Sequence, residues 1–182
     1  MLRITSGRFR GRAVEKPRNR DIRPTTSLVR ESVFNRLQSS ITGARFLDCF
    51  AGTGLMSLEA LSRGAQFALA IEKERNHWRI MHENFQNFGL VDTIANPVLK
   101  DALDVFSNPN KKEPFDIAYI DPPYGFEDMQ VFVDQLIENG WMKPDGILIV
   151  EQGIRDPELA GFDHRPHGDT RISIRRLSET PA

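Results

Sequence analysis

Apolar runs of strand length alternate with amphipathic stretches of helix length from Ala44 onward. Their periodicity predicts five strands, near residues 45–50, 67–72, 94–99, 115–120 and 146–151. Helices are expected near residues 55–63, 74–88, 101–106 and 128–139. Strands that alternate with helices form a parallel sheet with helices on both faces. The pattern therefore predicts a doubly wound α/β fold.

The C-terminal end departs from this alternation. Phe162–His167 and Arg171–Leu177 have the pattern of two strands, and Gly168-Asp169 between them is a turn signal. These segments predict an antiparallel hairpin that completes a seven-stranded, mostly parallel sheet.

A second hairpin is expected at the N-terminal end, where Leu2–Ile4 and Arg8–Val14 flank the turn signal Ser6-Gly7. Alternate side chains of a strand share one face, so Phe9 is expected to point toward the body. The opposite face would then be basic and would carry Arg8, Arg10 and Arg12.

An amphipathic helix is expected near residues 26–39, because Val29, Val33 and Leu37 recur at helical spacing. Pro24 precedes it, and Thr25 or Thr26 has the side chain of a helix cap. We therefore expect a basic arm over residues 1–22 and one catalytic domain over residues 23–182.

Composition narrows the class of protein. The 182 residues are 40% hydrophobic and 27% charged, as in an ordinary globular chain. No apolar run approaches the roughly 18 residues of a membrane helix, and the basic start lacks the apolar stretch of a signal peptide. The single Cys49 cannot form an internal disulfide. We expect a cytoplasmic, monomeric protein without a membrane partner.

Charge is distributed unevenly. Residues 1–40 hold ten Lys or Arg against three acidic residues, a net charge of +7, which leaves −8 for residues 41–182. A basic segment on an acidic body suggests a polyanionic partner such as a nucleic acid. The alternative is a solvated tail that binds nothing.

A glycine-rich loop follows the first strand of the body, with the sequence Ala51-Gly52-Thr53-Gly54. Glycines at the start of a helix let the backbone approach a ligand closely. A dinucleotide is one candidate, but Ser57 replaces the third small residue of its fingerprint. Asp48, just before the glycines, would oppose a pyrophosphate and would suit a cation. S-adenosylmethionine, with its sulfonium and ammonium groups, fits better.

Two more carboxylates end strands at the same predicted sheet edge. Glu72 is placed to accept hydrogen bonds from paired ribose hydroxyls, and Asp101 is placed to reach an adenine amine. Asp101 could equally cap the following helix, and the two roles can coexist.

Asp121-Pro122-Pro123-Tyr124 follows the strand at 115–120. The prolines fix the backbone and offer only carbonyl acceptors. An exocyclic base amine that donates both hydrogens, to Asp121 and to the Pro122 carbonyl, would localise its lone pair for attack on a methyl group. The carboxylate would also stabilise the positive charge that develops on nitrogen. Tyr124 is expected to stack on the base.

These motifs together resemble a known class of enzymes. Asp48–Gly54, Glu72, Asp101 and Asp121–Tyr124 resemble the S-adenosylmethionine-dependent amino-methyltransferases. The chain further resembles the RsmD family, in the segments Ile4–Arg12, Arg23–Phe34, Leu58–Ala65 and Ile71–Glu74. The likeness runs from the hairpin to about Val150 and is most specific in the first third of the chain.

The resemblance implies a Rossmann-like class I methyltransferase that acts on a guanine N2 in bacterial small-subunit ribosomal RNA, on the assembled subunit. It implies S-adenosylmethionine as cofactor, S-adenosylhomocysteine as product and no metal. It also implies that the hairpin touches RNA and that a cofactor-covering segment is formed by Arg23, Pro24 and Thr25. Ser27 departs from the family, whose members commonly carry an acid there.

Other functions are left open by the residues alone. The same loop could hold the amine of a DNA adenine or a protein glutamine, a dinucleotide-dependent oxidoreductase could use the glycine loop, and a non-catalytic RNA-binding module could keep the basic arm. His164 and His167 lie in an expected strand and do not form a convincing metal set.

Overall fold

The structure is a computed structural model, and it describes residues 2–17, 26–91, 94–123, 125–126 and 128–178. Its main sheet has seven strands in the order β5-β4-β3-β6-β7-β9-β8. The five strands that run parallel are β3 (Arg45–Asp48), β4 (Phe67–Glu72), β5 (Ala95–Leu99), β6 (Phe115–Ile120) and β7 (Met142–Gly153). The doubly wound sheet is thus confirmed.

The C-terminal hairpin is also confirmed. β9 (Thr170–Arg176) pairs antiparallel with β7, and β8 (Asp163–His167) pairs antiparallel with β9. The expected start of β7 was wrong, since the strand begins at Met142 and not near residue 146. The register shifts where Phe115 pairs with Met142, and this irregularity admits the polar residues that hid the start of the strand.

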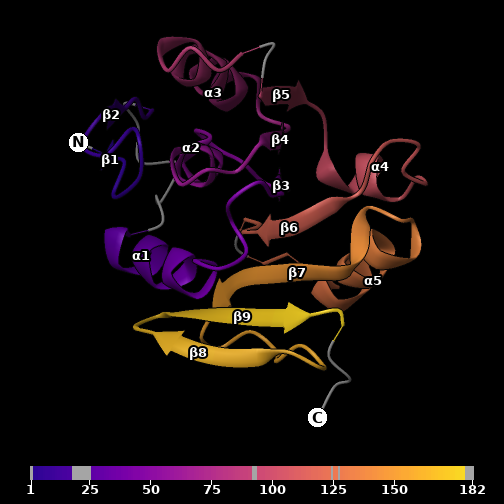
Figure 1. Cartoon of the computed structure of the whole chain (residues 1–182). Coiled ribbons are helices and arrows are strands. Elements are labelled where there is room, and N and C mark those ends of the chain that lie inside the picture. The colour runs from indigo at the N-terminus through magenta and orange to yellow at the C-terminus, as the bar shows by residue number, and fades with distance from the viewer. Residues whose placement is uncertain (1, 18–25, 92–93, 124, 127, 179–182) are drawn as a thin grey trace.

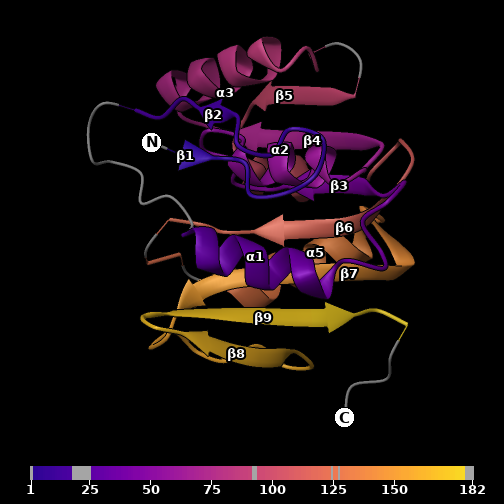
Figure 2. The same cartoon turned by 60° about the vertical axis from the view of Figure 1, so that its left-hand side comes forward.

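Helices cover both faces of the sheet (Figure 1). One face packs against α1 (Ser27–Arg36), α2 (Leu55–Ser62) and α3 (Arg75–Asn87), and the other against α4 (Ala102–Phe106) and α5 (Met129–Glu138). Figure 2 shows α1 lying along the sheet in front of β6 and β7. The expected helix of residues 26–39 ends earlier, with its last helical residue at Arg36.

Successive side chains of each strand enter different cores. On β6, Ile117 and Tyr119 belong to the apolar cluster under α1–α3, whereas Ala118 and Ile120 belong to the cluster under α4 and α5. Parallel strands buried on both faces give continuous apolar runs. That is why the strands were visible in the sequence.

The N-terminal hairpin is shorter than expected. β1 (Leu2–Arg3) pairs with β2 (Ala13–Val14), and residues 4–12 form a turn, so the strand that was to place three arginines on one face is wrong. Gly7 has φ +81°, and a Cβ there would lie 1.9 Å from the Ser62 carbonyl oxygen. The Arg8 amide donates to that oxygen at 2.8 Å. The turn is held by α2, a contact that the local sequence does not reveal.

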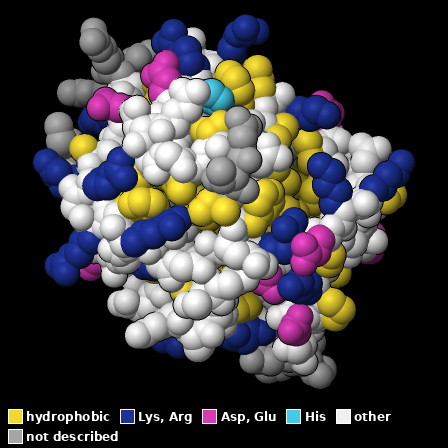
Figure 3. Space-filling view, turned by 45° about the horizontal axis from the view of Figure 1, so that its top comes forward, with side chains coloured by type: hydrophobic (Ala, Val, Ile, Leu, Met, Phe, Trp, Pro, Cys, Tyr) yellow, Lys and Arg dark blue, Asp and Glu magenta, His cyan; other side chains and the backbone are white. Residues whose placement is uncertain are grey.

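The side chains of this turn, which we call the hairpin turn (residues 4–12), are divided between the body and the solvent. Phe9 points toward the body, as expected, and meets Phe88 edge-on at 5.2 Å. Arg12 lies over the Phe88 ring at 4.1 Å and donates to the Asn87 carbonyl at 2.7 Å, so it serves docking as well as surface charge. Figure 3 shows Lys and Arg side chains around an area where hydrophobic side chains gather.

α1 is attached to the body by a charged contact inside the protein. Thr26 caps the helix by accepting from the Val29 amide at 3.3 Å, which confirms one of the two expected caps.

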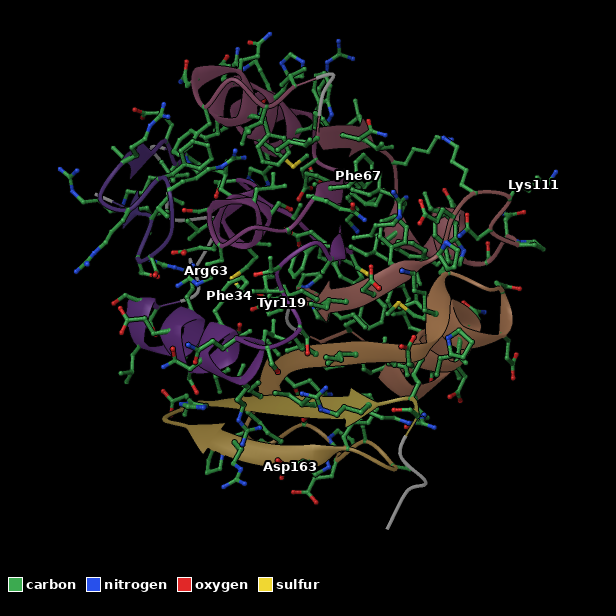
Figure 4. The ribbon with its side chains drawn as sticks, in the orientation of Figure 1. Phe34, Arg63, Phe67, Lys111, Tyr119 and Asp163 are labelled. Atoms are coloured by element: carbon green, nitrogen blue, oxygen red, sulfur yellow. The ribbon has the colours of Figure 1, made fainter. Side chains whose placement is uncertain are left out.

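Arg30, which contributes to the positive charge of residues 1–40, is only 3% exposed and pairs with buried Glu59 of α2. Figure 4 shows Arg63 beside Phe34, and its guanidinium lies 4.4 Å from the ring centre. Part of the +7 charge is therefore internal.

Candidate active site

A cavity of about 360 Å³ opens at the carboxyl ends of the parallel strands. It lies where strand order reverses, between β3 and β6, the position at which doubly wound sheets bind ligands. Its wall takes residues from each parallel strand end and from α1 and the C-terminal hairpin. From the strand ends come Cys49, Phe50, Gly52, Ile71–Glu74, Lys100–Ala102, Asp121–Pro123 and Glu151–Gly153.

The glycine loop joins β3 to α2. Gly52 has φ +54° and donates its amide to Glu72 Oε2 at 2.9 Å. Gly54 caps α2 with φ +76°, and a Cβ there would lie 2.6 Å from the Phe85 ring, so a larger residue is excluded. Gly52 lines the cavity, whereas Ala51, Thr53 and Gly54 form the loop behind the wall.

Glu72 connects the loop to the cavity. One carboxylate oxygen accepts from Gly52, and the other accepts from the Glu74 amide at 2.7 Å. Burial raises the pKa of this carboxyl, and the two backbone amides oppose the rise. Because each carboxylate oxygen has a second lone pair, Glu72 can hold the loop and still accept from a ligand hydroxyl.

Asp48 is placed differently from the other expected cofactor residues. It is 1% exposed, does not belong to the cavity wall, and accepts from the Ser57 hydroxyl at 2.8 Å and the Ser57 amide at 3.2 Å. Burial raises its pKa to about 7. Asp48 fastens the first turn of α2 to the end of β3, and so shapes the glycine loop from behind.

Asp101 caps a helix, which confirms one of the two roles considered for it. Its side chain caps α4 by accepting from the Leu103 amide at 3.0 Å, and the residue also lines the cavity. Lys73 Nζ lies 3.7 Å from its other oxygen.

The loop after β6 contributes three residues to the cavity wall: Asp121, Pro122 and Pro123. Four other site residues expected from the sequence lie outside the described residues: Arg23, Pro24, Thr25 and Tyr124.

Several residues of the site had no signal in the sequence. Glu151 lies near the carboxyl end of β7, beside Asp121. His167 reaches the cavity from the C-terminal hairpin, where its Nε2 lies 3.2 Å from the Ser32 hydroxyl of α1. Asn84 of α3 donates to the Thr53 carbonyl and to the Glu15 carbonyl, both at 3.0 Å. It thereby ties the glycine loop to the segment after the hairpin. Only the adjacency of elements distant in sequence gives these residues a role.

The cavity is strongly acidic. Two lysines, Lys73 and Lys100, face six carboxylates of the wall: Glu72, Glu74, Asp101, Asp121, Glu151 and Asp156. Such a wall attracts a cationic ligand and repels a pyrophosphate. Within the described ranges, no group of three His, Cys, Asp or Glu is arranged to hold a metal, and no helix is long and apolar enough to cross a membrane.

Comparison with known proteins gives consistent results. The family model described as conserved hypothetical protein 95 matches residues 2–172. The chain is 34% identical over 156 residues to ribosomal RNA small subunit methyltransferase D of Escherichia coli K12. The aligned region covers 85% of this chain and 76% of that protein.

Two solved structures extend the comparison. An E. coli protein described as a candidate methyltransferase, yhhF, superposes with a TM-score of 0.84 at 29% identity, over 98% of this chain and 99% of that one. A 16S rRNA N2 G1207 methyltransferase of Thermus thermophilus, solved with AdoMet and guanosine, gives 0.67 at 18% identity, over 87% and 44%. The second likeness concerns the fold alone.

Proposed function

The chain belongs to the conserved hypothetical protein 95 family, the RsmD family of methyltransferases, and from this premise we propose that it methylates the exocyclic N2 amine of a guanine in small-subunit ribosomal RNA. The observation that carries the proposal is the placement of Asp121-Pro122-Pro123 and Glu72 on the wall of one acidic cavity. In this proposal the cofactor lies against Glu72 and the amine lies against Asp121, and we call the part of the cavity beside Asp121 its acceptor end.

S-adenosylmethionine, when bound, supplies an electrophilic methyl group on a positively charged sulfur. The acidic wall attracts that charge, Glu72 accepts from the ribose hydroxyls, and Asp101 accepts from the adenine amine. The glycine loop, which Asp48 and Asn84 hold from behind, brings backbone amides close to the ligand. No metal is required for these contacts.

The chain's own residues prepare the acceptor amine. The Asp121 carboxylate and the Pro122 carbonyl accept its two hydrogens, so the nitrogen lone pair is directed away from the ring and toward the methyl group. As the carbon–nitrogen bond forms, the carbon–sulfur bond breaks and its electron pair stays on sulfur, so S-adenosylhomocysteine would leave as a neutral thioether. The positive charge passes to nitrogen, where Asp121 stabilises it. Asp121 is then placed to accept the proton that the methylated amine must lose.

An RNA substrate is supported by the family and by the hairpin turn. The E. coli relative is named as a methyltransferase of small-subunit ribosomal RNA. Exposed Arg8 and Arg10 are placed to contact phosphate, with Arg12 partly engaged by Phe88. A dinucleotide-dependent oxidoreductase is disfavoured because a pyrophosphate would face six carboxylates.

The test is transfer of a labelled methyl group from S-adenosylmethionine to small ribosomal subunits and to naked ribosomal RNA prepared from cells that lack the enzyme. The product nucleoside is identified by mass spectrometry. We expect N2-methylguanosine at one position, with transfer to assembled subunits exceeding transfer to naked RNA. Label in N6-methyladenosine or in protein would contradict the proposal.

A further inference from the structure

Two carboxylates lie on adjacent strands near the carboxyl ends of those strands, at the cavity wall. β6 and β7 run parallel, with Ile120 paired to Val150, so the next residues, Asp121 just past β6 and Glu151 within β7, lie side by side. Both residues line the cavity. Asp121 has a role in the proposed reaction, and Glu151 has none so far.

Glu151 is held in place from below. The Tyr119 hydroxyl donates a hydrogen bond to Glu151 Oε2, and Tyr119 is 1% exposed. Figure 4 shows Tyr119 at the centre of the sheet, on the side of α1. The Tyr119 ring is packed in the core, so its hydroxyl is held at one place and positions the carboxylate oxygen to which it donates. A carboxylate has about four lone-pair sites on its two oxygens, so Glu151 can accept from Tyr119 and from a ligand together.

The edges of the nucleobases differ in a way that two adjacent carboxylates can distinguish. Guanine presents donors on neighbouring atoms, the N2 amine and the N1–H. Adenine and cytosine each present an amine next to a ring nitrogen that is an acceptor. An ionised carboxylate is an acceptor only, so it attracts an N1–H and repels an acceptor nitrogen.

We propose that Glu151, oriented by Tyr119, accepts a hydrogen bond from N1–H of the target guanine while Asp121 accepts from N2. This assignment rests on the proposed function and makes Glu151 a specificity-determining residue of the same site. A site built around a donor on its substrate rejects bases that lack the donor, because the carboxylate then faces an acceptor nitrogen and makes no hydrogen bond to the base.

The test uses Glu151→Gln and Tyr119→Phe, with Glu138→Gln on the exposed side of α5 as a control that removes a carboxylate remote from the cavity. The substrates are reconstituted small subunits that carry either guanine or 2-aminopurine at the nucleotide methylated by the wild type. 2-Aminopurine keeps the N2 amine but has an acceptor at N1. S-adenosylmethionine affinity, measured by calorimetry, reports that each variant is folded.

For guanine we expect Glu151→Gln to lower kcat/KM by about 10- to 100-fold, the effect of losing a hydrogen bond to a charged group. Because the glutamine amide can donate to an acceptor N1, the preference for guanine over 2-aminopurine should shrink by at least about tenfold. Tyr119→Phe should reduce the preference in the same direction and less. Glu138→Gln should match the wild type.

Failure of this inference can be distinguished from failure of the proposed function. Suppose that the wild type methylates guanine N2 and that Glu151→Gln lowers kcat/KM for the guanine and the 2-aminopurine substrates by the same factor. The specificity role is then wrong, and the proposed function stands. If Glu151→Gln leaves both rates unchanged, the role is also wrong. If the wild type transfers no methyl group to guanine N2, the proposed function itself fails.

Discussion

Arg30 Nε lies 3.1 Å from Glu59 Oε1, although 29 positions separate the two residues and both are almost fully buried. Glu59 also accepts from the Thr5 amide at 2.9 Å and pairs with Arg63. One carboxylate of α2 therefore joins the hairpin turn, α1 and its own helix.

Glu59→Gln should lower the free energy of unfolding by about 3–5 kcal/mol, because it leaves Arg30 buried without its counter-charge. Urea unfolding measures the change. The matched control is Glu83→Gln, whose surface pair with Arg79 is 3.9 Å long and should be worth less than about 1 kcal/mol. Equal effects of the two variants would show that the buried pair contributes nothing beyond a surface pair.

Asp48 should make stability depend on pH. Its pKa is about 7 in the folded state and near 3.8 in the unfolded chain, so the folded state binds the additional proton between these values. The free energy of unfolding should therefore fall as pH rises from about 4 to about 7, by on the order of 4 kcal/mol from this group. Above that range the contribution is constant.

Asp48→Asn isolates this contribution, because asparagine does not titrate and can still accept from Ser57. Relative to the wild type, the variant should gain stability between about pH 4 and about pH 7.5 in urea unfolding without cofactor. Asp145→Asn, at an exposed site, serves as the control. A difference between Asp48→Asn and wild type that stays constant over this range would contradict the raised pKa.

Glu72→Ala should weaken S-adenosylmethionine binding at least about tenfold, since two ribose hydroxyls lose a charged acceptor. Calorimetric titration measures the affinity, and Glu83→Gln should bind normally. Burial raises the pKa of Glu72, so this carboxyl takes up a proton at a higher pH than an exposed glutamate does. The cofactor affinity of the wild type should therefore begin to fall at a correspondingly higher pH during acidification. A folded Glu72→Ala variant with unchanged affinity would remove Glu72 from the site.

Asp121→Ala should separate chemistry from cofactor binding. Loss of the carboxylate that faces the amine should lower kcat by at least about 100-fold, the scale seen when one preorganised charge-stabilising group is removed. S-adenosylmethionine affinity should stay near wild type, because Asp121 lies at the acceptor end of the cavity. A variant that loses affinity and rate together would place Asp121 at the cofactor.

The hairpin turn can be tested without Arg12, which docks the turn on Phe88. Arg8→Gln with Arg10→Gln should reduce the slope of log affinity for RNA against log salt by roughly 1.4–1.8, since each phosphate that a side chain neutralises adds about 0.7–0.9 to it. Lys111→Gln with Lys112→Gln removes the same charge at a distant edge, where Figure 4 shows Lys111. If both double variants shift the slope equally, the turn makes no specific phosphate contact.

The elements of the sheet could be predicted because burial on both faces leaves continuous apolar runs, and because glycines mark the turns between them. The ends of β3, β4, β5 and β6 then brought Gly52, Glu72, Asp101 and Asp121 to one cavity, as the parallel order required. These features follow from local pattern and from the rule that parallel strands end at one edge.

The remainder depended on contacts between distant segments. The conformation of the hairpin turn is set by its contact with the Ser62 carbonyl and not by its own alternation of side chains. Arg30 is neutralised by a helix that begins 25 residues later, and Glu151 lies beside Asp121 only because β7 is next to β6. A residue whose partner is set by tertiary packing gives no periodic signal in sequence.

Because Gly7 packs against Ser62, α2 connects the hairpin turn to the glycine loop and sets the distance between them. At its C-terminal end the helix holds the hairpin turn, and at its N-terminal end it begins at Gly54 of the glycine loop. Eight helical residues fix these ends about 12 Å apart. If RNA binds at the hairpin turn and the cofactor at the glycine loop, as proposed, α2 holds the two binding surfaces at a fixed separation. The distance between the phosphate contacts and the target base would then contribute to substrate selection.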